Sequence, residues 1–431
     1  MKMRMKHAIA IGAAIWTIPM TQAVAGIDVQ AGDWKLDFSG NANGFYVDAN
    51  CDHGTNTAVY GGLVCTGDNA ASVRNGLLPG ALVFSATTRQ EDIDVNVTIG
   101  FYPGINSTDE GAAGANNGGY PRALGTPGID ARQTFLTFGD ASWGTVKIGR
   151  DIGLFGKDAI LDDMTLLGVG TAAGNAAPGN TSLGRIGLGY IYTDWEPQIT
   201  YTTPSFGGFT LSGGAFQPLD AIANGSATGA APQYTSHSTP QWQVGAGFAW
   251  GDPKSDALTG KVWVDVVSQQ VKADSSLIAG YNYAGIATNY TGTAVDGGVK
   301  LDVAGFEAVL YGYSGKGVGT TGLYLYGASD GGETRKSDGG YVQFTYKFDK
   351  LKLGASYGIS ELKLAGDEQQ QVAGVDVSDL LKRNSSFVGG VYYSLTKSVT
   401  LVGEFIDSKA TAWNGNEGTE KDVALGGILF F

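Results

Sequence analysis

The sequence DARQTFLTFGD at residues 130–140 and the sequence WGTVKIGRD at residues 143–151 contain the pattern that decides the fold. They predict two β-strands joined by a tight turn. In the second stretch Val146 and Ile148 flank Lys147, so apolar and polar side chains take opposite faces of the strand. One face is therefore suited to an apolar environment and the other to a polar one.

The segment from Ile152 to Glu196 is rich in Gly and Ala and is too long for an ordinary connection. Loops longer than about 12–15 residues are usually functional or disordered. A long loop that follows a strand with a charged inner face is explained if the strands close into a barrel and the loop folds into its lumen. We therefore predict an all-β transmembrane barrel with a constriction formed by this loop.

The amino-acid composition is that of a transmembrane β-barrel rather than of a helical membrane protein. Charged residues make up only 16% of the chain, against about 25% in typical soluble proteins. Gly accounts for 68 of 431 residues and aromatic residues for 11%, and no long apolar run follows the N-terminal segment. Strands that alternate lipid-facing apolar residues with small or polar residues toward the lumen have this balance.

Residues 1–25 have the pattern of a cleaved secretory signal peptide. Three basic residues precede a short apolar core, and Ala23-Val24-Ala25 supplies the small residues of a cleavage site. The mature barrel domain is expected to be residues 26–431, in which 25 of the 28 basic residues remain against 41 acidic residues, a net charge of −16. Such a charge disfavours binding to nucleic acid.

Cys51 and Cys65 are the two cysteines of the chain, and both lie in the expected mature protein. Export into an oxidising compartment predicts a disulfide between them. Two free thiols in a loop are the alternative. The spacing is not C-x-x-C, so we expect a structural link and no redox role.

Segments of about ten residues with alternating hydrophobicity recur from Asp33 onward, as strands of about 9–11 tilted residues require to cross a membrane. The clearest runs from Ile93 to Phe101. A soluble β-sandwich explains single runs of this kind, but sustained repetition with long polar loops favours a barrel. Sixteen antiparallel strands are expected, at residues 33–48, 80–89, 92–102, 130–139, 143–150, 197–203, 208–217, 241–250, 258–270, 293–303, 306–314, 339–348, 351–362, 385–395, 398–408 and 422–431.

Short turns alternate with eight long loops that are rich in Gly, Asn, Ser and Asp. Short periplasmic turns on one rim and long extracellular loops on the other are typical of outer-membrane barrels. Aromatic residues lie beside the predicted periplasmic turns, where an interfacial girdle is expected. They are Trp34, Phe138, Trp143, Phe206, Phe209, Trp250, Phe306, Phe348 and Phe431.

Three motifs resemble those of the sixteen-stranded, trimeric general-diffusion porins of Gram-negative bacteria. The pair RQTF at 132–135 and WGTVKIGR at 143–150 resembles the hairpin before that family's third loop. The segment ITYTTPSFGGF at 199–209 resembles its Y-x-S-P-x-F-x-G-F turn, with Thr203 in place of Ser. The final Phe431 resembles the C-terminal signal that outer-membrane assembly machinery recognises. With the signal peptide and the strand count, the likeness covers nearly the whole mature chain.

The resemblance implies a homotrimer in outer-membrane lipid that forms a water-filled channel for passive diffusion of small hydrophilic solutes and ions. It also implies a third loop whose carboxylates oppose basic residues on the wall, an arrangement that tunes charge selectivity. Lys147 is the best-supported basic candidate, because a Lys facing lipid near mid-membrane costs about 2–4 kcal/mol. The acidic candidates are Asp158, Asp162 and Asp163, and the basic candidates are Lys35, Arg89, Arg132, Lys147, Arg150 and Arg185.

Other interpretations remain open. The acidic cluster is alternatively a solvated loop, and two adjacent carboxylates fall short of the about 6–8 oxygen ligands of Ca²⁺, so neither a metal nor a cofactor is expected. An enzyme is disfavoured because His53 and His237 alone follow the signal peptide, without a nucleophile elbow, an H-E-x-x-H motif or a P-loop. A substrate-specific channel requires a narrowed lumen with a binding track. A non-conducting adhesin or structural barrel predicts no ion conductance.

Overall fold

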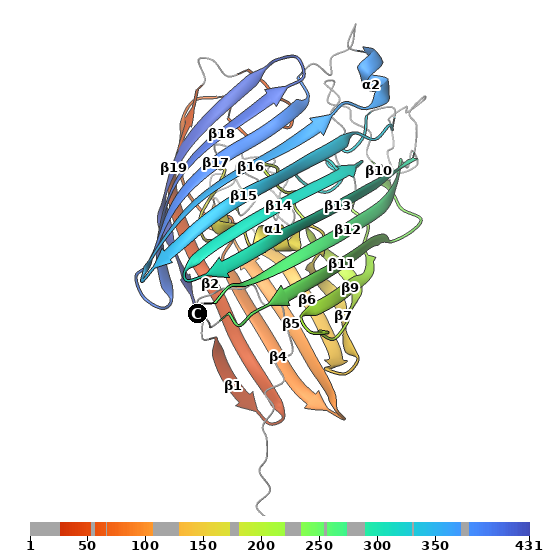
Figure 1. Ribbon diagram of the computed structural model, residues 1–431, viewed down its shortest axis with the longest axis vertical. Coiled ribbons are helices and arrows are strands. Elements are labelled where there is room, and N and C mark those ends of the chain that lie inside the picture. Colours follow the sequence, from red (N-terminus) through yellow and green to blue (C-terminus); the bar gives the residue numbers. More distant parts are fainter. Residues whose placement is uncertain are drawn as a thin grey trace, which may run out of the picture.

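The computed structural model describes residues 26–52, 57–65, 67–106, 129–172, 181–219, 234–253, 257–273, 289–329, 332–371 and 379–431. In this part of the chain, β-strands form one closed antiparallel sheet with little helix (Figure 1). The expected signal peptide, residues 1–25, and His53 lie outside the described residues.

The sixteen long strands agree closely with the strands expected from hydrophobic alternation. The described helices are short, and none of them combines the length and the hydrophobicity that crossing a membrane requires. The long strands are β2 (Trp34–Cys51), β4 (Ala81–Gln90), β5 (Ile93–Pro103), β6 (Ile129–Asp140), β7 (Gly144–Ile152), β8 (Trp195–Thr202), β9 (Phe209–Phe216), β11 (Gln241–Trp250), β12 (Thr259–Ala273), β13 (Asn289–Val303), β14 (Phe306–Lys316), β15 (Lys336–Phe348), β16 (Leu351–Lys363), β17 (Leu381–Ser394), β18 (Val399–Ala412) and β19 (Glu417–Phe430). The short elements are β1 (Ile27–Ala31), β3 (Ala70–Arg74), β10 (Tyr234–Ser236), α1 (Lys157–Leu161), the 3-10 helix η1 (Met164–Leu167) and α2 (Gly366–Gln371).

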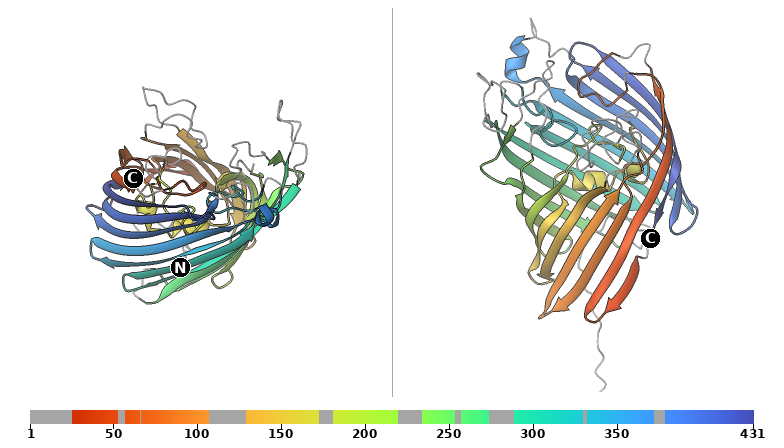
Figure 2. Two further views of the ribbon diagram at one scale, coloured as in Figure 1. Left: turned by 90° about the horizontal axis from the view of Figure 1, so that it is seen from above. Right: turned by 180° about the vertical axis from the view of Figure 1, so that it is seen from behind.

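The barrel closes where the last strand meets the first long strand. β19 pairs with β2 from Glu420 opposite Cys51 to Phe430 opposite Asn41. Beyond this ladder Gly40 N–H donates to the Phe431 carbonyl at 2.9 Å, and Phe431 N–H donates to the Gly40 carbonyl at 3.1 Å. A membrane-spanning sheet requires such closure because lipid offers no partner to an unpaired strand edge. The views from above and behind show the resulting enclosure (Figure 2).

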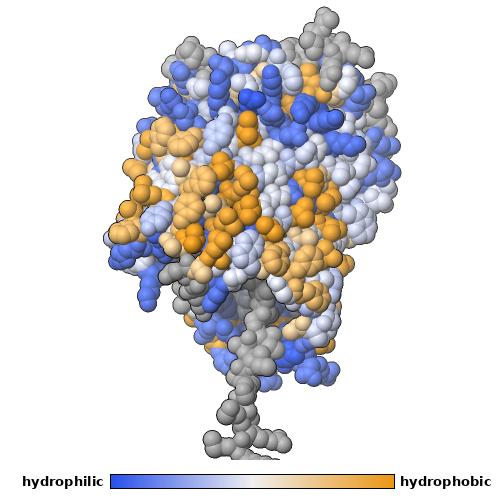
Figure 3. Space-filling view, viewed as in Figure 1, coloured by the Kyte–Doolittle hydropathy of each residue, from blue (hydrophilic) through white to orange (hydrophobic). Residues whose placement is uncertain are grey.

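The two faces of each strand meet different surroundings. On β12, Val262, Val264 and Val266 point outward and are exposed, whereas Asp265 and Val267 between and beyond them are buried. Apolar side chains form a broad band across the outer wall, and polar side chains lie above it (Figure 3). This alternation matches a wall with lipid outside and a polar lumen inside.

Two features of the strands differ from the expectation. The eighth connection is a turn of only Trp413–Asn416, because β18 and β19 continue past residue 408 and begin before residue 422. In the added stretch the outward side chains are polar, as in the exposed ion pair of Lys409 with Glu417, so hydrophobic alternation does not reveal the strand. In addition, β1 forms a hairpin with β2 that was not expected.

Cys51, at the end of β2, forms a disulfide with Cys65 in the first loop, and their Cα atoms lie 5.4 Å apart. The Cys65 N–H also donates to Oε2 of Glu420 on β19 at 2.6 Å. The first loop is thereby attached to both strands that close the barrel.

We predict that the Cys51→Ser/Cys65→Ser double variant loosens the first loop without dissolving the barrel. A disulfide that closes a loop of this length contributes about 3 kcal/mol in the chain-entropy model. Limited proteolysis of the folded protein should show faster cleavage between β2 and β4. Dithiothreitol should reproduce this effect in the wild-type protein and add nothing in the variant; equal cleavage of all samples would contradict the prediction.

We predict that deletion of Phe431 impairs assembly into the outer membrane. The deletion removes the two main-chain hydrogen bonds to Gly40, each about 0.5–1.5 kcal/mol, and a ring whose centroid lies 5.4 Å from that of Phe38. The folded fraction in outer-membrane preparations, seen as heat-modifiable migration in electrophoresis, should fall. Phe431→Tyr keeps the main chain and the ring and should assemble normally. Undiminished assembly of the deletion variant would disprove the role of this terminus.

Candidate functional site

The third loop, residues 153–194, leaves β7 and enters the lumen, where α1 and η1 lie across the inside of the barrel (Figure 2). Asp163 caps η1, since its carboxylate accepts a hydrogen bond from the Thr165 N–H at 2.9 Å. Ala159 and Ile160 of α1 and Leu166 of η1 are buried. The apolar side chains therefore draw this segment onto the inner wall.

Two lysines of the barrel wall bind the carboxylates of α1 and its C-cap. Lys261 on β12 pairs with Asp158, and its Nζ lies 2.9 Å from Oδ2 of Asp162. Lys300 on β13 lies 3.5 Å from Oδ1 of Asp162 and 2.8 Å from Oε2 of Glu307. Asp162 is buried, so its charge is stabilised by these partners and not by water.

Acceptor side chains on the inner wall hold the main chain of the loop at intervals along its path. Glu404 on β18 is an example, since its Oε2 accepts hydrogen bonds from the N–H groups of Val169 and Gly170 at 2.8 and 2.9 Å. A charged acceptor makes such bonds stronger than neutral ones. The other acceptors are Gln243 for Leu154 and Phe155 (2.6 and 3.0 Å), Asp296 for Gly156 (2.7 Å), Gln343 for Met164 (2.7 Å) and Asp422 for Ala172 (3.5 Å).

The loop passes very close to Glu404 at Gly168. A Cβ atom at Gly168 would lie 2.1 Å from Oε1 of Glu404, which is closer than any non-bonded contact allows. A larger residue at position 168 would therefore displace the Glu404 carboxylate from its hydrogen bonds to Val169 and Gly170.

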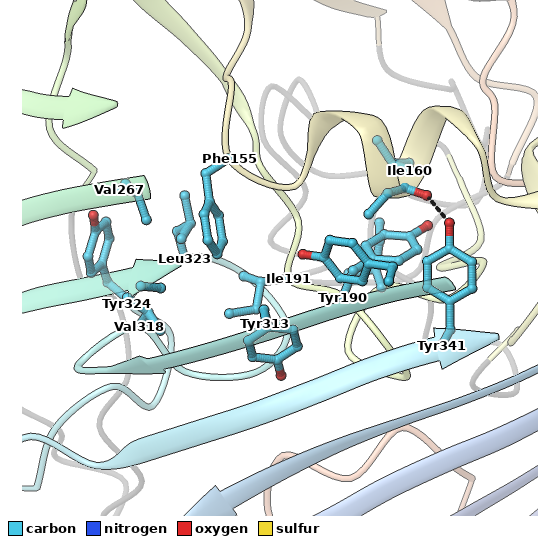
Figure 4. Close-up of a cluster of buried hydrophobic side chains, with 14 of the residues drawn as sticks. Phe155, Ile160, Tyr190, Ile191, Val267, Tyr313, Val318, Leu323, Tyr324 and Tyr341 are labelled. Atoms are coloured by element: carbon cyan, nitrogen blue, oxygen red, sulfur yellow. Dashed lines mark hydrogen bonds between the residues drawn. The ribbon is translucent and has the colours of Figure 1, made fainter. Parts of the chain in front are cut away.

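Aromatic and aliphatic side chains fill the space between the loop and the wall of β12–β15. Phe155, Tyr190 and Ile191 come from the loop, and Tyr313 and Tyr341 come from the wall (Figure 4). The Tyr341 hydroxyl also donates to the Ala159 carbonyl at 2.8 Å. Burial of large side chains contributes about 1.5–3 kcal/mol each, so the loop is held by packing as well as by polar contacts.

The returning half of the loop encloses Asp163. The Tyr190 hydroxyl donates to Oδ2 of Asp163 at 2.9 Å. Arg185 is fully buried and donates to the Ser386 carbonyl on β17 at 3.1 Å. Asp163 and Arg185 are thus part of the packed interior of the loop and do not line open water.

The six basic candidates take positions away from the acidic pair. Among the described residues none of them forms an ion pair with Asp158 or Asp162. Arg150 lies three residues after Lys147 on β7. Its side chain therefore faces outward with that of Ile148, and the side chain of Lys147 faces the lumen. Their contacts are Asp28 for Lys35 (3.0 Å), Asp94 and Asp140 for Arg89 (2.7 and 2.8 Å), Asp130 for Arg132 (3.0 Å), Asp151 for Lys147, the Trp195 carbonyl for Arg150 and the Ser386 carbonyl for Arg185.

Lys261 and Lys300 are the site residues that sequence reasoning missed. Val262 follows Lys261, and Val299 and Leu301 flank Lys300. The side chains of these three apolar residues face outward. The argument that places Lys147 toward the lumen applies equally to both. Their identity as partners of the loop is not visible in the sequence, since they lie 103 and 138 residues from the carboxylates they bind.

The comparisons with known proteins agree with this architecture. The model of the Gram-negative porin family matches residues 16–412. No curated protein sequence matches the chain. Three similar solved structures are the outer membrane channel DcaP of Acinetobacter baumannii (17% identity, TM-score 0.64, 94% of this chain and 100% of that one), the anion-selective porin of Comamonas acidovorans (13%, 0.56, 92% and 100%) and the trimer form of OmpT of Vibrio cholerae (13%, 0.51, 92% and 99%).

We predict that Lys261 and Asp162 act as a coupled pair that holds the loop. Removing one partner of a buried ion pair costs about 3–5 kcal/mol because the other charge is left unpaired. The variants Lys261→Met and Asp162→Asn should each lower the free energy of unfolding, measured by urea titration in lipid vesicles. The sum of these two losses should exceed the loss in the double variant. Lys147→Met combined with Asp162→Asn is the control and should be additive, because Lys147 pairs with Asp151 on its own strand. Additivity of both pairs would contradict the coupling.

Proposed function

The chain belongs to the Gram-negative porin family and is a diffusion channel of the outer membrane, and we propose that solutes pass between α1 and the inner wall formed by β4, β6 and β7. Members of this family are channels without enzymatic activity. The proposal concerns where the passage lies, which charges line it and how many subunits form the functional unit.

Unequal coverage of the inner wall carries this proposal. The loop buries inward-facing side chains along β11–β18, among them Gln243, Tyr341 and Glu404. Several inward-facing side chains of β4, β6 and β7 keep partial exposure, although Asn96 and Thr98 on β5 between them are buried. The partly exposed side chains include Val83, Ser85, Gln133, Phe135, Thr137 and Lys147. Water therefore has access to this side of the lumen, opposite the wall that the loop covers.

The charged constriction has two sides in this proposal. Lys147 with Asp151 lies on the open wall, and the Lys147 side chain is 29% exposed. Asp158 with Lys261 lies on the loop side, and these side chains are 9% and 16% exposed. Because each side carries an acid and a base, the net field across the passage is small. Weak charge selectivity follows, in which Asp163 takes no direct part.

The same family membership supports a homotrimer as the functional unit, since one structural neighbour is described in a trimer form. Residues 1–25 act as a cleaved signal peptide, and the terminal strand that ends in Phe431 is the contact for the assembly machinery. Small hydrophilic solutes and ions are the cargo.

Planar-bilayer recording of the purified protein tests the channel and its subunit number. Conductance in large steps, grouped in threes, is expected for a trimeric diffusion channel. A substrate-specific channel is the second candidate, because the loop covers so much of the inner wall; it predicts small conductance that one class of solute blocks. A silent bilayer would contradict both and favour a structural barrel.

The reversal potential under a salt gradient tests the charged lining. Lys147→Gln should shift the preference toward cations, and Asp158→Asn should shift it toward anions, because each removes one charge from one side of the passage. Lys421→Gln changes an outward-facing residue of β19 and should leave the potential unchanged. Identical potentials for all three variants would show that these residues do not line the passage.

A further inference from the structure

Three lysines form a row on the outer wall near its extracellular rim. Lys316 at the end of β14 lies opposite Lys336 on β15, and Lys336 lies opposite Lys363 on β16. All three are exposed. Neighbouring strands are about 4.8 Å apart, so the three Cα atoms fall within about 10 Å. Like charges directly opposite one another on adjacent strands destabilise a sheet. An anion bound beside the three lysines would therefore stabilise this part of the wall.

Among the described residues, an ion pair compensates one end of the row. Lys363 lies 2.8 Å from Oδ2 of Asp338. Within the described residues neither Lys316 nor Lys336 forms an ion pair. Asp338 also accepts a hydrogen bond from the Ser314 hydroxyl at 2.6 Å and interacts with the charge of Lys336, so this one carboxylate serves two of the three lysines.

Lysines at the same rim on β18 and β19, beside the β19–β2 pairing that closes the barrel, have a different arrangement. Lys409 on β18 lies 2.6 Å from Oε2 of Glu417. Lys421 on β19 is opposite Asp407 in the strand register. Each of these two lysines therefore has a carboxylate as its own neighbour, whereas among the described residues Lys316 has none in an ion pair and Lys336 shares Asp338 with Lys363. This contrast is local and supplies a control for an experiment.

A cavity of about 510 Å³ lies beside the row. Lys316 lines it together with the threonines Thr291, Thr293 and Thr334. Threonine hydroxyls can donate hydrogen bonds to phosphate oxygens. Glu333 also lines the cavity, but its Oε2 accepts a hydrogen bond from the Asp367 N–H at 3.1 Å. The cavity thus combines hydroxyl donors and one carboxylate with the Lys316 ammonium group, which forms no ion pair with a described residue.

The row lies at the level of lipid headgroups. Below it the outward side chains are apolar and exposed, for example Leu310, Phe344 and Tyr357, and the polar zone begins above this band (Figure 3). On β16 Lys363 lies four positions beyond Ile359. For a rise of about 3.3 Å per residue and a tilt near 45°, Lys363 lies about 9 Å above Ile359 along the membrane normal.

We propose that Lys316, Lys336 and Lys363 bind the phosphate group of an outer-leaflet lipid headgroup, and that the adjacent cavity accommodates the polar part of that headgroup. The side chains point away from the lumen, so a membrane lipid reaches them and a solute in transit does not. The ends of the strands that carry them join the long loops, which places the row in the outer leaflet.

Lipid A with two phosphate groups, added to the full-length protein in neutral detergent and counted by native mass spectrometry, tests the proposal. Wild-type protein should bind it more tightly than lipid A from which both phosphates have been removed. Lys316→Gln/Lys336→Gln should weaken binding of the phosphorylated lipid about thirty-fold, since each basic residue near a charged membrane surface contributes about five-fold. Lys409→Gln/Lys421→Gln loses the same charge and should bind like the wild type.

Heat-modifiable migration confirms that both double variants are folded before binding is compared. Equal affinity of wild-type protein for the two lipids would overturn the proposal, as would equal losses in the two double variants. Inorganic phosphate is the competitor that separates a lipid site from a site for free phosphate. Displacement of lipid A by phosphate alone at millimolar concentration would assign the row to the free anion and reject the lipid.

Discussion

The main chain of a membrane-spanning sheet must satisfy its own hydrogen bonds, and the rest of this structure depends on that constraint. Lipid offers no donors or acceptors, so sixteen strands close on themselves and β19 pairs with β2. Closure leaves an interior lined by alternate residues of every strand. That interior is wide enough to admit a loop, and its polar lining then determines where the loop can lie.

The third loop is held chiefly through its main chain. Carboxylate and amide oxygens on β11, β13, β15, β18 and β19 accept its N–H groups, and the lysines on β12 and β13 bind Asp158 and Asp162. These contacts lie on one side of the barrel. As a result the loop lies against this part of the wall, and the passage proposed above lies on the side where β4, β6 and β7 keep partly exposed inward side chains.

Hydrophobic alternation predicts the strands well because it is a local property. The signal fails at the tip of β18 and β19, where polar side chains such as Lys409 continue a strand beyond the membrane. The site is predicted less completely. The inward direction of Lys147 follows from its neighbours, and the acids of the loop are identified by type. Their partners Lys261 and Lys300 differ from the six bases expected from the sequence, and Arg185 lies buried within the loop.

The sequence by itself determined the barrel, its strand number, the family and the inward-folded loop. Each of these follows from period-two alternation, turn spacing or motifs within a few tens of residues. Only the tertiary structure decided which charges meet, which wall the loop covers and that three lysines align across β14, β15 and β16. Such contacts join residues about a hundred positions apart, or depend on strand register. Closure of the whole barrel sets them, and no local pattern encodes them.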